Sequence, residues 1–227
     1  MKNKNILISL GVLVVAGIIT FLVLGGGSSI NKSKKTVATV NGEKVTKAEF
    51  LSRYNQLKKT FSSRTKGASL SKGMKDQLKS RTLDRLIGEA LIFQEAKEKG
   101  FTASSSRVEK RYQQVVSKLG GESALEKRLK KVGVSKKEFK DGIRKQLTVQ
   151  KYIAAQKKTA NLNISEKEIR DFYDRMKKSQ KNPPSFEKAK SKIKSQLKRQ
   201  KESQFISSLV SDLRKKANIS TSTISIK

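Results

Sequence analysis

The chain has 227 residues, enough for one domain of ordinary size together with a membrane segment. It carries 52 Lys and Arg residues against 19 Asp and Glu, and the net charge of +33 attracts polyanions non-specifically. The chain contains no Cys and no His, which excludes disulfides, thiol nucleophiles, thiolate metal sites and histidine general bases. The composition therefore favours a binding protein over an enzyme, and we expect no catalytic residue, no metal and no cofactor.

Residues 6–24 form an apolar run of 19 residues without a charge. In a helix that rises about 1.5 Å per residue, this run nearly spans a hydrocarbon core of about 30 Å. We predict a transmembrane anchor at 6–24, a cytoplasmic tail at 1–5 and a flexible Gly/Ser/Lys linker at 25–35. The GGGSS sequence at 25–29 also fits a signal-peptide cleavage site, so a secreted form stays open.

The orientation of the predicted anchor is not decided by its flanking charges. Lysines lie on both sides of the apolar run, so the positive-inside count is close to a tie. Long domains cross a membrane largely regardless of charge. We therefore expect the N-terminus inside the cell and the large domain on the extracytoplasmic side of the plasma membrane, in the periplasm or at the cell surface.

The folded part is expected to begin with a strand and a tight turn at 36–45. Its Asn41-Gly42 pair is a strong hairpin signal, because both residues accept a positive φ. A capping box follows, in which the Thr46 hydroxyl and the Glu49 carboxylate satisfy each other's backbone amides. This capping box predicts a helix over 47–60.

Apolar residues at helical spacing predict further helices, separated from the first by a polar loop at 61–73. Two more capping boxes, Ser135 with Glu138 and Ser165 with Glu168, open two of these helices. The Asn-Pro-Pro run at 182–184 interrupts the pattern before the last one. The second helix is expected at 75–99, and the following helices begin their apolar stripes at Val108, Leu125, Phe139, Ile169 and Phe186.

The C-terminal tail changes from helical spacing to alternation. Ile219, Thr221, Ile224 and Ile226 are separated by Ser and Thr, which predicts a strand. We expect this strand to pair with the strand at the front, so that the two ends of the domain meet. The predicted fold class is therefore mainly α: a multi-helix bundle with one small β element, preceded by one transmembrane helix.

Several stretches of the chain resemble one known family. VATVNGEKVTKAEF, RTLDRLIGEALIFQEAKEKGF, GVSKKEFKDGIRKQLTVQKYI and ISEKEIRDFYD are similar to the N-terminal domain of the SurA and PrsA class of bacterial chaperones. The stretch at 185–219 resembles the helix that returns to complete that domain in the family. The resemblance covers 36–227 and implies an N-terminal lobe at 36–160, followed by C-terminal helices and a closing strand at 161–227.

The chain departs from the family at one place. Relatives commonly insert a parvulin-type prolyl isomerase before the returning helix, whereas only residues 175–186 occupy that place here. The His and Cys residues usual in parvulin sites are absent, and the lipidated Cys that anchors PrsA-type relatives would be replaced by the segment at 6–24. The resemblance therefore implies a chaperone that binds unfolded or newly exported polypeptides without isomerase activity.

Phe139, Phe172, Tyr173 and Met176 are the candidates for a client-binding surface, because aromatic and Met side chains adapt to varied partners. Core residues have the same helical spacing, so a purely structural role stays open for all four. Two other functions also stay open: a surface protein that binds polyanions such as DNA or cell-wall polymer, and a degenerate prolyl isomerase. The lysines are spread along every segment, so the charge also fits an ordinary solvated surface. The sequence does not predict an oligomeric state.

Overall fold

The computed structural model describes residues 35–65, 69–132, 134–180 and 182–222. The predicted tail at 1–5, the predicted anchor at 6–24 and nearly all of the predicted linker lie outside the described residues, as does the end of the predicted C-terminal strand. Among the described helices, none combines the length and the apolar character that a membrane span requires.

Contacts divide the chain into two compact units. Of the described residues, the sheet unit contains those from 35 to 152 and from 210 to 222, and the α7–α8 unit contains Ile153–Leu209. The lobes expected at 36–160 and 161–227 stay a prediction. The last residues return to the sheet unit because the C-terminal strand pairs with the first one.

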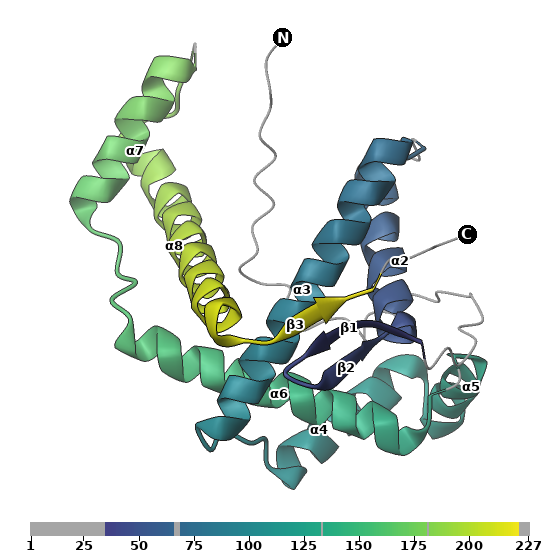
Figure 1. The fold of residues 1–227 in the computed structure, drawn as a ribbon. Coiled ribbons are helices and arrows are strands. Elements are labelled where there is room, and N and C mark those ends of the chain that lie inside the picture. The colour runs from purple at the N-terminus through teal and green to yellow at the C-terminus, as the bar shows by residue number, and fades with distance from the viewer. Residues whose placement is uncertain (1–34, 66–68, 133, 181, 223–227) are drawn as a thin grey trace. The chain divides into compact units, whose positions relative to one another are not determined.

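A three-stranded antiparallel sheet joins the two ends of the described chain (Figure 1). Strand β1 (Thr36–Val40) pairs with β2 (Glu43–Thr46) through a turn in which Asn41 has a φ of 51° and Gly42 a φ of 82°. Strand β3 (Ile219–Thr221) pairs with the other edge of β1, giving the order β2-β1-β3. The predicted hairpin turn and the pairing of the two ends are both confirmed.

Helices α2 (Lys47–Arg64) and α3 (Lys72–Glu98) follow the hairpin. The capping box of Thr46 is present at the start of α2, as predicted. Helix α2 is longer than expected, so the predicted loop at 61–73 was too long. In the additional turn, Ser63 Oγ donates to the Lys59 carbonyl oxygen at 3.0 Å, so this hydroxyl is bonded within the helix.

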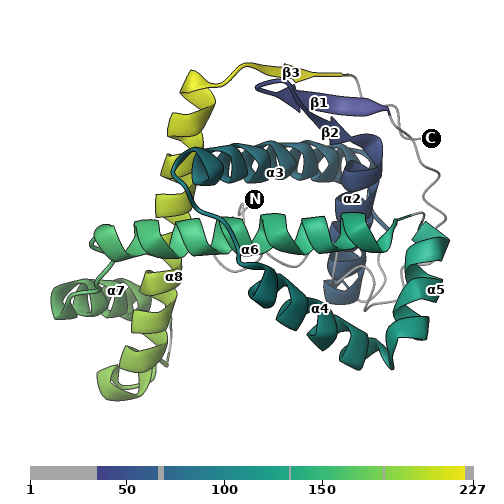
Figure 2. The same cartoon turned by 90° about the horizontal axis from the view of Figure 1, so that it is seen from below.

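The sheet packs its inner face on α3 (Figure 2). The core between them consists of β-strand valines and alanine together with aromatic and aliphatic side chains from α2 and α3: Val37, Ala38, Val40, Val45, Phe50, Tyr54, Ile87, Ala90 and Leu91. Leu213 and Ile219 pack against this core from the end of the chain. Burial of these side chains fixes the register of the hairpin, because a slip of one residue would turn the valines outward.

Helices α4 (Ser105–Leu119), α5 (Glu122–Val132) and α6 (Lys136–Thr159) surround a second core of the sheet unit. Helix α4 ends at Gly120, which has a φ of 88° and turns the chain sharply into α5. The buried side chains of this core are Ala103, Val108, Tyr112, Val115, Leu119, Leu125, Leu129, Phe139 and Ile143. The predicted capping box at the start of α6 is present, since Glu138 accepts from the backbone N–H of Ser135 at 2.8 Å.

Helices α7 (Glu166–Ser179) and α8 (Phe186–Lys216) complete the chain. Ser165 and Glu168 form the third predicted capping box at the start of α7. The segment that contains Pro183 and Pro184 separates the two helices, as predicted, because proline cannot donate the backbone hydrogen bonds that a helix interior needs.

Candidate functional site

Helices α7 and α8 pack through a small group of apolar side chains, which we call the α7–α8 apolar cluster. Only three of its members, Ile169, Ala189 and Ile193, are buried. Six further members are partly exposed around them: Ile164, Phe172, Tyr173, Met176, Phe186 and Leu197. A two-helix pair is too thin to cover both sides of its own core, so these six side chains stay partly exposed.

The N-terminus of α7 is held by polar contacts beside this cluster. The carboxylate of Glu168 accepts from the backbone N–H of Ser165 at 2.9 Å and forms an ion pair with Lys201 of α8 at 2.7 Å. The hydrogen bond from Lys201, followed by those from Ser165, lowers the pKa of Glu168 from 4.5 to about 2. These contacts orient α7 on α8. Phe172 and Met176 then lie at the partly exposed edge of the cluster, which we call the rim.

Tyr173 is fixed at both ends of its side chain. Its hydroxyl donates to the carbonyl oxygen of Pro184 at 2.9 Å, and its ring meets the ring of Phe186 edge to face, with centroids 5.3 Å apart. The Pro-Pro segment therefore positions Tyr173 directly, and this arrangement keeps the aromatic end of the cluster ordered.

Cations surround the aromatic end of the cluster. The guanidinium of Arg170 lies 4.5 Å from the centroid of the Phe186 ring, and the ammonium of Lys190 lies 5.7 Å from it. Glu166 bonds to Lys190 at 2.8 Å, and this hydrogen bond lowers the pKa of the Glu166 carboxyl. The rim thus offers positive charge next to partly exposed aromatic rings, an arrangement that suits polypeptides carrying both apolar and acidic side chains.

The structure brings together three of the four residues predicted from the sequence. Phe172, Tyr173 and Met176 lie in the α7–α8 apolar cluster and are partly exposed. Phe139 does not join them. It is 0% exposed in the core of the sheet unit, where its ring lies 6.0 Å from that of Tyr112. An incoming chain cannot contact a side chain buried in this way, so Phe139 is a core residue and its prediction as a client-binding residue is wrong.

The sequence reasoning missed three members of the cluster, namely Ile164, Phe186 and Leu197. Phe186 and Leu197 were recognised as part of the apolar stripe of the last helix but not as neighbours of Phe172. The sequence allowed this contact to be predicted. A helix that begins directly after a Pro-Pro turn folds back on the helix before that turn, so the apolar stripes of the two helices face each other.

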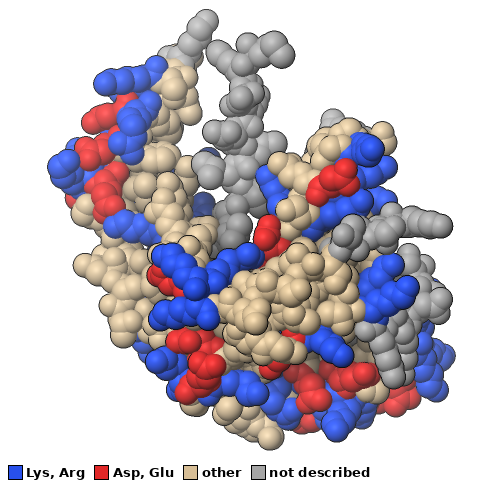
Figure 3. All heavy atoms as spheres, viewed as in Figure 1, with Lys and Arg blue, Asp and Glu red and all other residues tan. Residues whose placement is uncertain are grey.

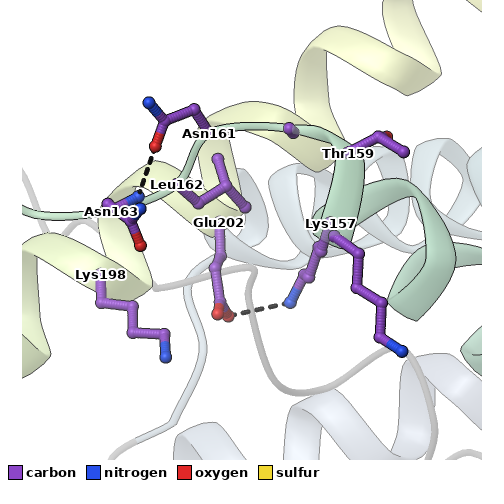
Figure 4. Close-up of a pocket in the computed structure, with 9 residues that line it drawn as sticks. Lys157, Thr159, Asn161, Leu162, Asn163, Lys198 and Glu202 are labelled. Atoms are coloured by element: carbon purple, nitrogen blue, oxygen red, sulfur yellow. Dashed lines mark hydrogen bonds and ion pairs between the residues drawn. The ribbon is translucent and has the colours of Figure 1, made fainter.

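An open hollow of about 500 Å³ lies beside the cluster, between the end of α6, the following loop and α8 (Figure 4). Its lining is mostly polar and consists of Lys157, Lys158, Thr159, Ala160, Asn161, Leu162, Asn163, Lys198 and Glu202. Lys157 crosses the hollow to form an ion pair with Glu202 at 2.9 Å. The hollow is therefore suited to polar groups of a bound chain, and the apolar contacts are left to the cluster.

The described residues offer no metal centre, since none of their acidic side chains gather in groups of three or more at ligand spacing.

Comparisons with known proteins agree with the fold. A family model described as the SurA-like N-terminal domain matches residues 1–153. The foldase protein PrsA of Caldanaerobacter subterraneus subsp. tengcongensis is 29% identical over 154 residues, which cover 65% of this chain and 44% of that protein. The foldase protein PrsA of Clostridium botulinum strain 657 is 25% identical over 154 residues, covering 63% of this chain and 45% of that protein.

The chain thus spans less than half the length of these curated relatives. The α7–α8 apolar cluster lies C-terminal to the residues that the family model matches. The resemblance to SurA-like and PrsA-like N-terminal domains, inferred from the sequence, is confirmed over the part of 36–227 that the family model matches, residues 36–153. Because the match extends over 153 of 227 residues, the chain belongs to the family of SurA-like N-terminal domains.

Proposed function

We propose that this protein is a membrane-anchored extracytoplasmic chaperone that binds unfolded or newly exported polypeptides and does not isomerise prolyl bonds. The α7–α8 apolar cluster carries the proposal, because six partly exposed apolar side chains surround only three buried ones. Unfolded chains expose the side chains that such a surface binds. The curated relatives are named foldases, which supports a role in protein folding.

The composition of the cluster fits weak, reversible binding. Covering apolar surface gains about 25 cal/mol per Å², so a few side chains offer only a few kcal/mol. Association costs about 4 kcal/mol or more in lost freedom of motion, which leaves a small net affinity. A holding chaperone needs such an affinity, since it must release its client. The cations around Phe186 add attraction to acidic segments and keep the complex soluble.

The short connection between α7 and α8 supports the absence of isomerase activity. Helix α7 ends at Ser179 and α8 begins at Phe186, so six residues join them at the place where relatives carry an isomerase domain. Six residues cannot form a folded domain. A refolding reaction limited by proline isomerisation should run at the same rate with and without the protein, and an acceleration above background would contradict this part of the proposal.

Membrane anchoring rests on the apolar run at 6–24. Protease added to intact cells should degrade the large domain if it lies outside the plasma membrane. Protection of the domain in intact cells, with cleavage only after lysis, would contradict the extracytoplasmic location.

Aggregation of an unfolded model protein tests the central activity. The full chain in phosphatidylcholine nanodiscs should suppress this aggregation at equimolar ratio, compared with empty nanodiscs. Substituting two rim residues, Phe172→Ala with Met176→Ala, should weaken the suppression several-fold. The matched control is Val116→Ala with Leu147→Ala, which removes partly buried apolar side chains from the sheet unit. No suppression by the unaltered chain, or an equal loss in both variants, would contradict the proposal.

One observation favours polyanion binding as a second candidate function. Lys188, Lys192 and Arg199 lie on one exposed face of α8, and none of the three forms an ion pair with a carboxylate in the described ranges. Binding of a DNA oligonucleotide would then fall steeply with salt, with a slope set by the number of phosphates contacted. This candidate would be removed if DNA binding depended only weakly on salt and the double substitution Lys188→Gln with Lys192→Gln left that dependence unchanged.

A further inference from the structure

The far end of the α2–α3 pair exposes an apolar side chain, and we call this end the α2–α3 tip. Figure 1 shows the two helices running side by side away from the sheet. Met74 in the first turn of α3 is 39% exposed. Among the described residues, it is the most exposed large apolar side chain. One helical turn further along the same face, Leu78 is already half buried against the core of the sheet unit. Met74 therefore extends the apolar face of α3 beyond the part that the protein covers.

The sequence on both sides of Met74 is strongly basic. The described stretches 54–65 and 69–83 contain seven Lys and Arg residues and a single acidic residue, Asp76. Asp76 is bonded to Lys79 at 3.0 Å. Lys58, Lys72, Lys75 and Arg81 are exposed, and Figure 3 shows basic side chains, with some acidic ones among them, on the upper part of α3. The α2–α3 tip thus combines an exposed apolar side chain with several exposed cations on the helices that form it.

This combination matches the chemistry of an anionic bilayer surface. An apolar side chain is stabilised just below the headgroups, while lysines extend their charged ends to lipid phosphates. Juxtamembrane cations are attracted to anionic lipids over about one Debye length. Single-stranded nucleic acid would instead favour aromatic side chains on which bases stack, and the exposed large apolar side chain of the tip is a methionine.

The linker between the predicted anchor and the first strand is long enough to permit such docking. The backbone N–H of Lys47, at the start of α2, donates to the carbonyl oxygen of Lys35 at 2.8 Å. Helix α2 has 18 residues, so its far end lies about 27 Å from this point. The ten residues at 25–34 can extend to at most about 33–36 Å. A chain that enters the bilayer at residue 24 therefore allows the tip to touch the membrane surface.

We infer that the α2–α3 tip docks on anionic phospholipid headgroups of the membrane that holds the protein, with Met74 entering the interface. The inference rests on the proposed anchoring at 6–24 and is independent of client binding by the α7–α8 apolar cluster. Docking would hold the sheet unit in one orientation on the membrane surface.

The absence of Cys from the chain allows one probe to be placed at the tip. The full chain with Met74→Cys carries an environment-sensitive fluorophore and is reconstituted in nanodiscs, either of phosphatidylcholine alone or of phosphatidylcholine mixed with phosphatidylglycerol. We expect a blue-shifted emission, with several-fold stronger quenching by nitroxide-labelled lipid, only in the discs that contain phosphatidylglycerol.

A charge-matched pair of variants separates a specific surface from a general attraction. Lys72→Gln, Lys75→Gln and Arg81→Gln together should abolish most of the quenching. Lys127→Gln, Lys130→Gln and Lys131→Gln remove the same charge from exposed positions of α5 and should leave the quenching unchanged. Equal loss in both variants would overturn the inference.

Four further outcomes would also overturn it. If the fluorophore at position 74 reports an aqueous environment in discs containing phosphatidylglycerol, tip docking is excluded, whereas the proposed anchoring at 6–24 is not affected. Equal quenching without phosphatidylglycerol shows that the charge is irrelevant. A chain that does not co-elute with either disc refutes the anchoring and, with it, the docking. Binding of a DNA oligonucleotide that alters the probe signal where anionic discs do not would assign the tip to nucleic acid instead.

Discussion

Asn41 and Asn218 hydrogen-bond to each other in both directions, although 177 positions separate them in the sequence. The backbone N–H of Asn41 donates to the carbonyl oxygen of Asn218 at 2.8 Å, and the backbone N–H of Asn218 donates to Oδ1 of Asn41 at 2.8 Å. Asn41 Nδ2 also donates to Gln94 Oε1 at 2.9 Å, and Gln94 Nε2 donates to the carbonyl oxygen of Val40 at 2.9 Å. One side chain in the hairpin turn thus connects the turn, α3 and the end of the chain.

Replacing Asn41 should therefore loosen the closure of the sheet unit. Asn41→Ala removes two side-chain hydrogen bonds and places alanine at a φ of 51°, so we expect a loss of about 1–3 kcal/mol in the free energy of unfolding. Urea denaturation measures this loss. Asn41→Gly keeps the backbone conformation but loses the side-chain hydrogen bonds. Its free energy of unfolding should therefore lie between those of Asn41→Ala and the unaltered chain. Unchanged stability in Asn41→Ala would show that the connection contributes nothing.

Close packing between α3 and the end of α8 gives a second prediction. A Cβ atom added at Gly88 would lie 3.3 Å from Cγ1 of Val210, closer than most carbon contacts. Gly88→Val should thus destabilise the protein by about 1–3 kcal/mol through overpacking. Combining it with Val210→Ala should restore part of the stability, because the smaller side chain frees the space. Purely additive losses in the double variant would exclude a direct contact.

A partly buried carboxylate joins α2 to α3 and gives a third prediction. Glu89 accepts two hydrogen bonds from Arg53 at 2.8 Å each and also pairs with Arg85 at 3.1 Å. Burial, together with the nearby charge of Arg53, lowers the pKa of Arg85. Glu89→Gln leaves two arginines facing each other and should cost about 2–4 kcal/mol in thermal or urea unfolding.

The control for Glu89 is the exposed carboxylate of Asp141, which pairs with Arg144 at 2.7 Å. Asp141→Asn should change the free energy of unfolding by less than about 0.5 kcal/mol, because water screens an exposed pair. Similar losses in both variants would mean that burial of the Glu89 contacts is irrelevant to their strength.

Acid should weaken the junction of α7 and α8. The pKa of Glu168 is lowered from 4.5 to about 2 in the folded protein, so its contribution to stability is complete above the unfolded pKa. That contribution is lost as the pH falls from about 5 towards 2. Glu168→Gln retains the capping pattern but cannot titrate, so its unfolding free energy should depend less on pH in this range. Equal pH dependence in Glu168→Gln and the unaltered chain would contradict the assignment.

The sequence was informative wherever local chemistry decides the structure. Three capping boxes, the Asn41-Gly42 turn and the Pro-Pro break all act over a few residues, and each was predicted at its observed place. The pairing of β3 with β1 was also predicted, because alternating apolar residues at both ends of a helical chain need a partner strand. Such features depend little on the rest of the fold.

Side-chain exposure was not available from the sequence. Phe139 and Phe172 both follow a capping box at helical spacing, yet one is fully buried and the other is partly exposed. The difference arises from the number of neighbouring helices, since α4 and α5 both pack against Phe139 of α6, whereas Phe172 of α7 packs against α8. Helical periodicity identifies the apolar face of a helix but does not tell how many elements cover it.

Site-specific crosslinking during client binding tests the central claim most directly. A photoreactive amino acid at Phe172 or Met176 of the full chain should form covalent adducts with an unfolded client, and the same amino acid at the exposed Lys127 of α5 should form few. Comparable adducts at all three positions, or none at Phe172 and Met176, would contradict binding at the α7–α8 apolar cluster.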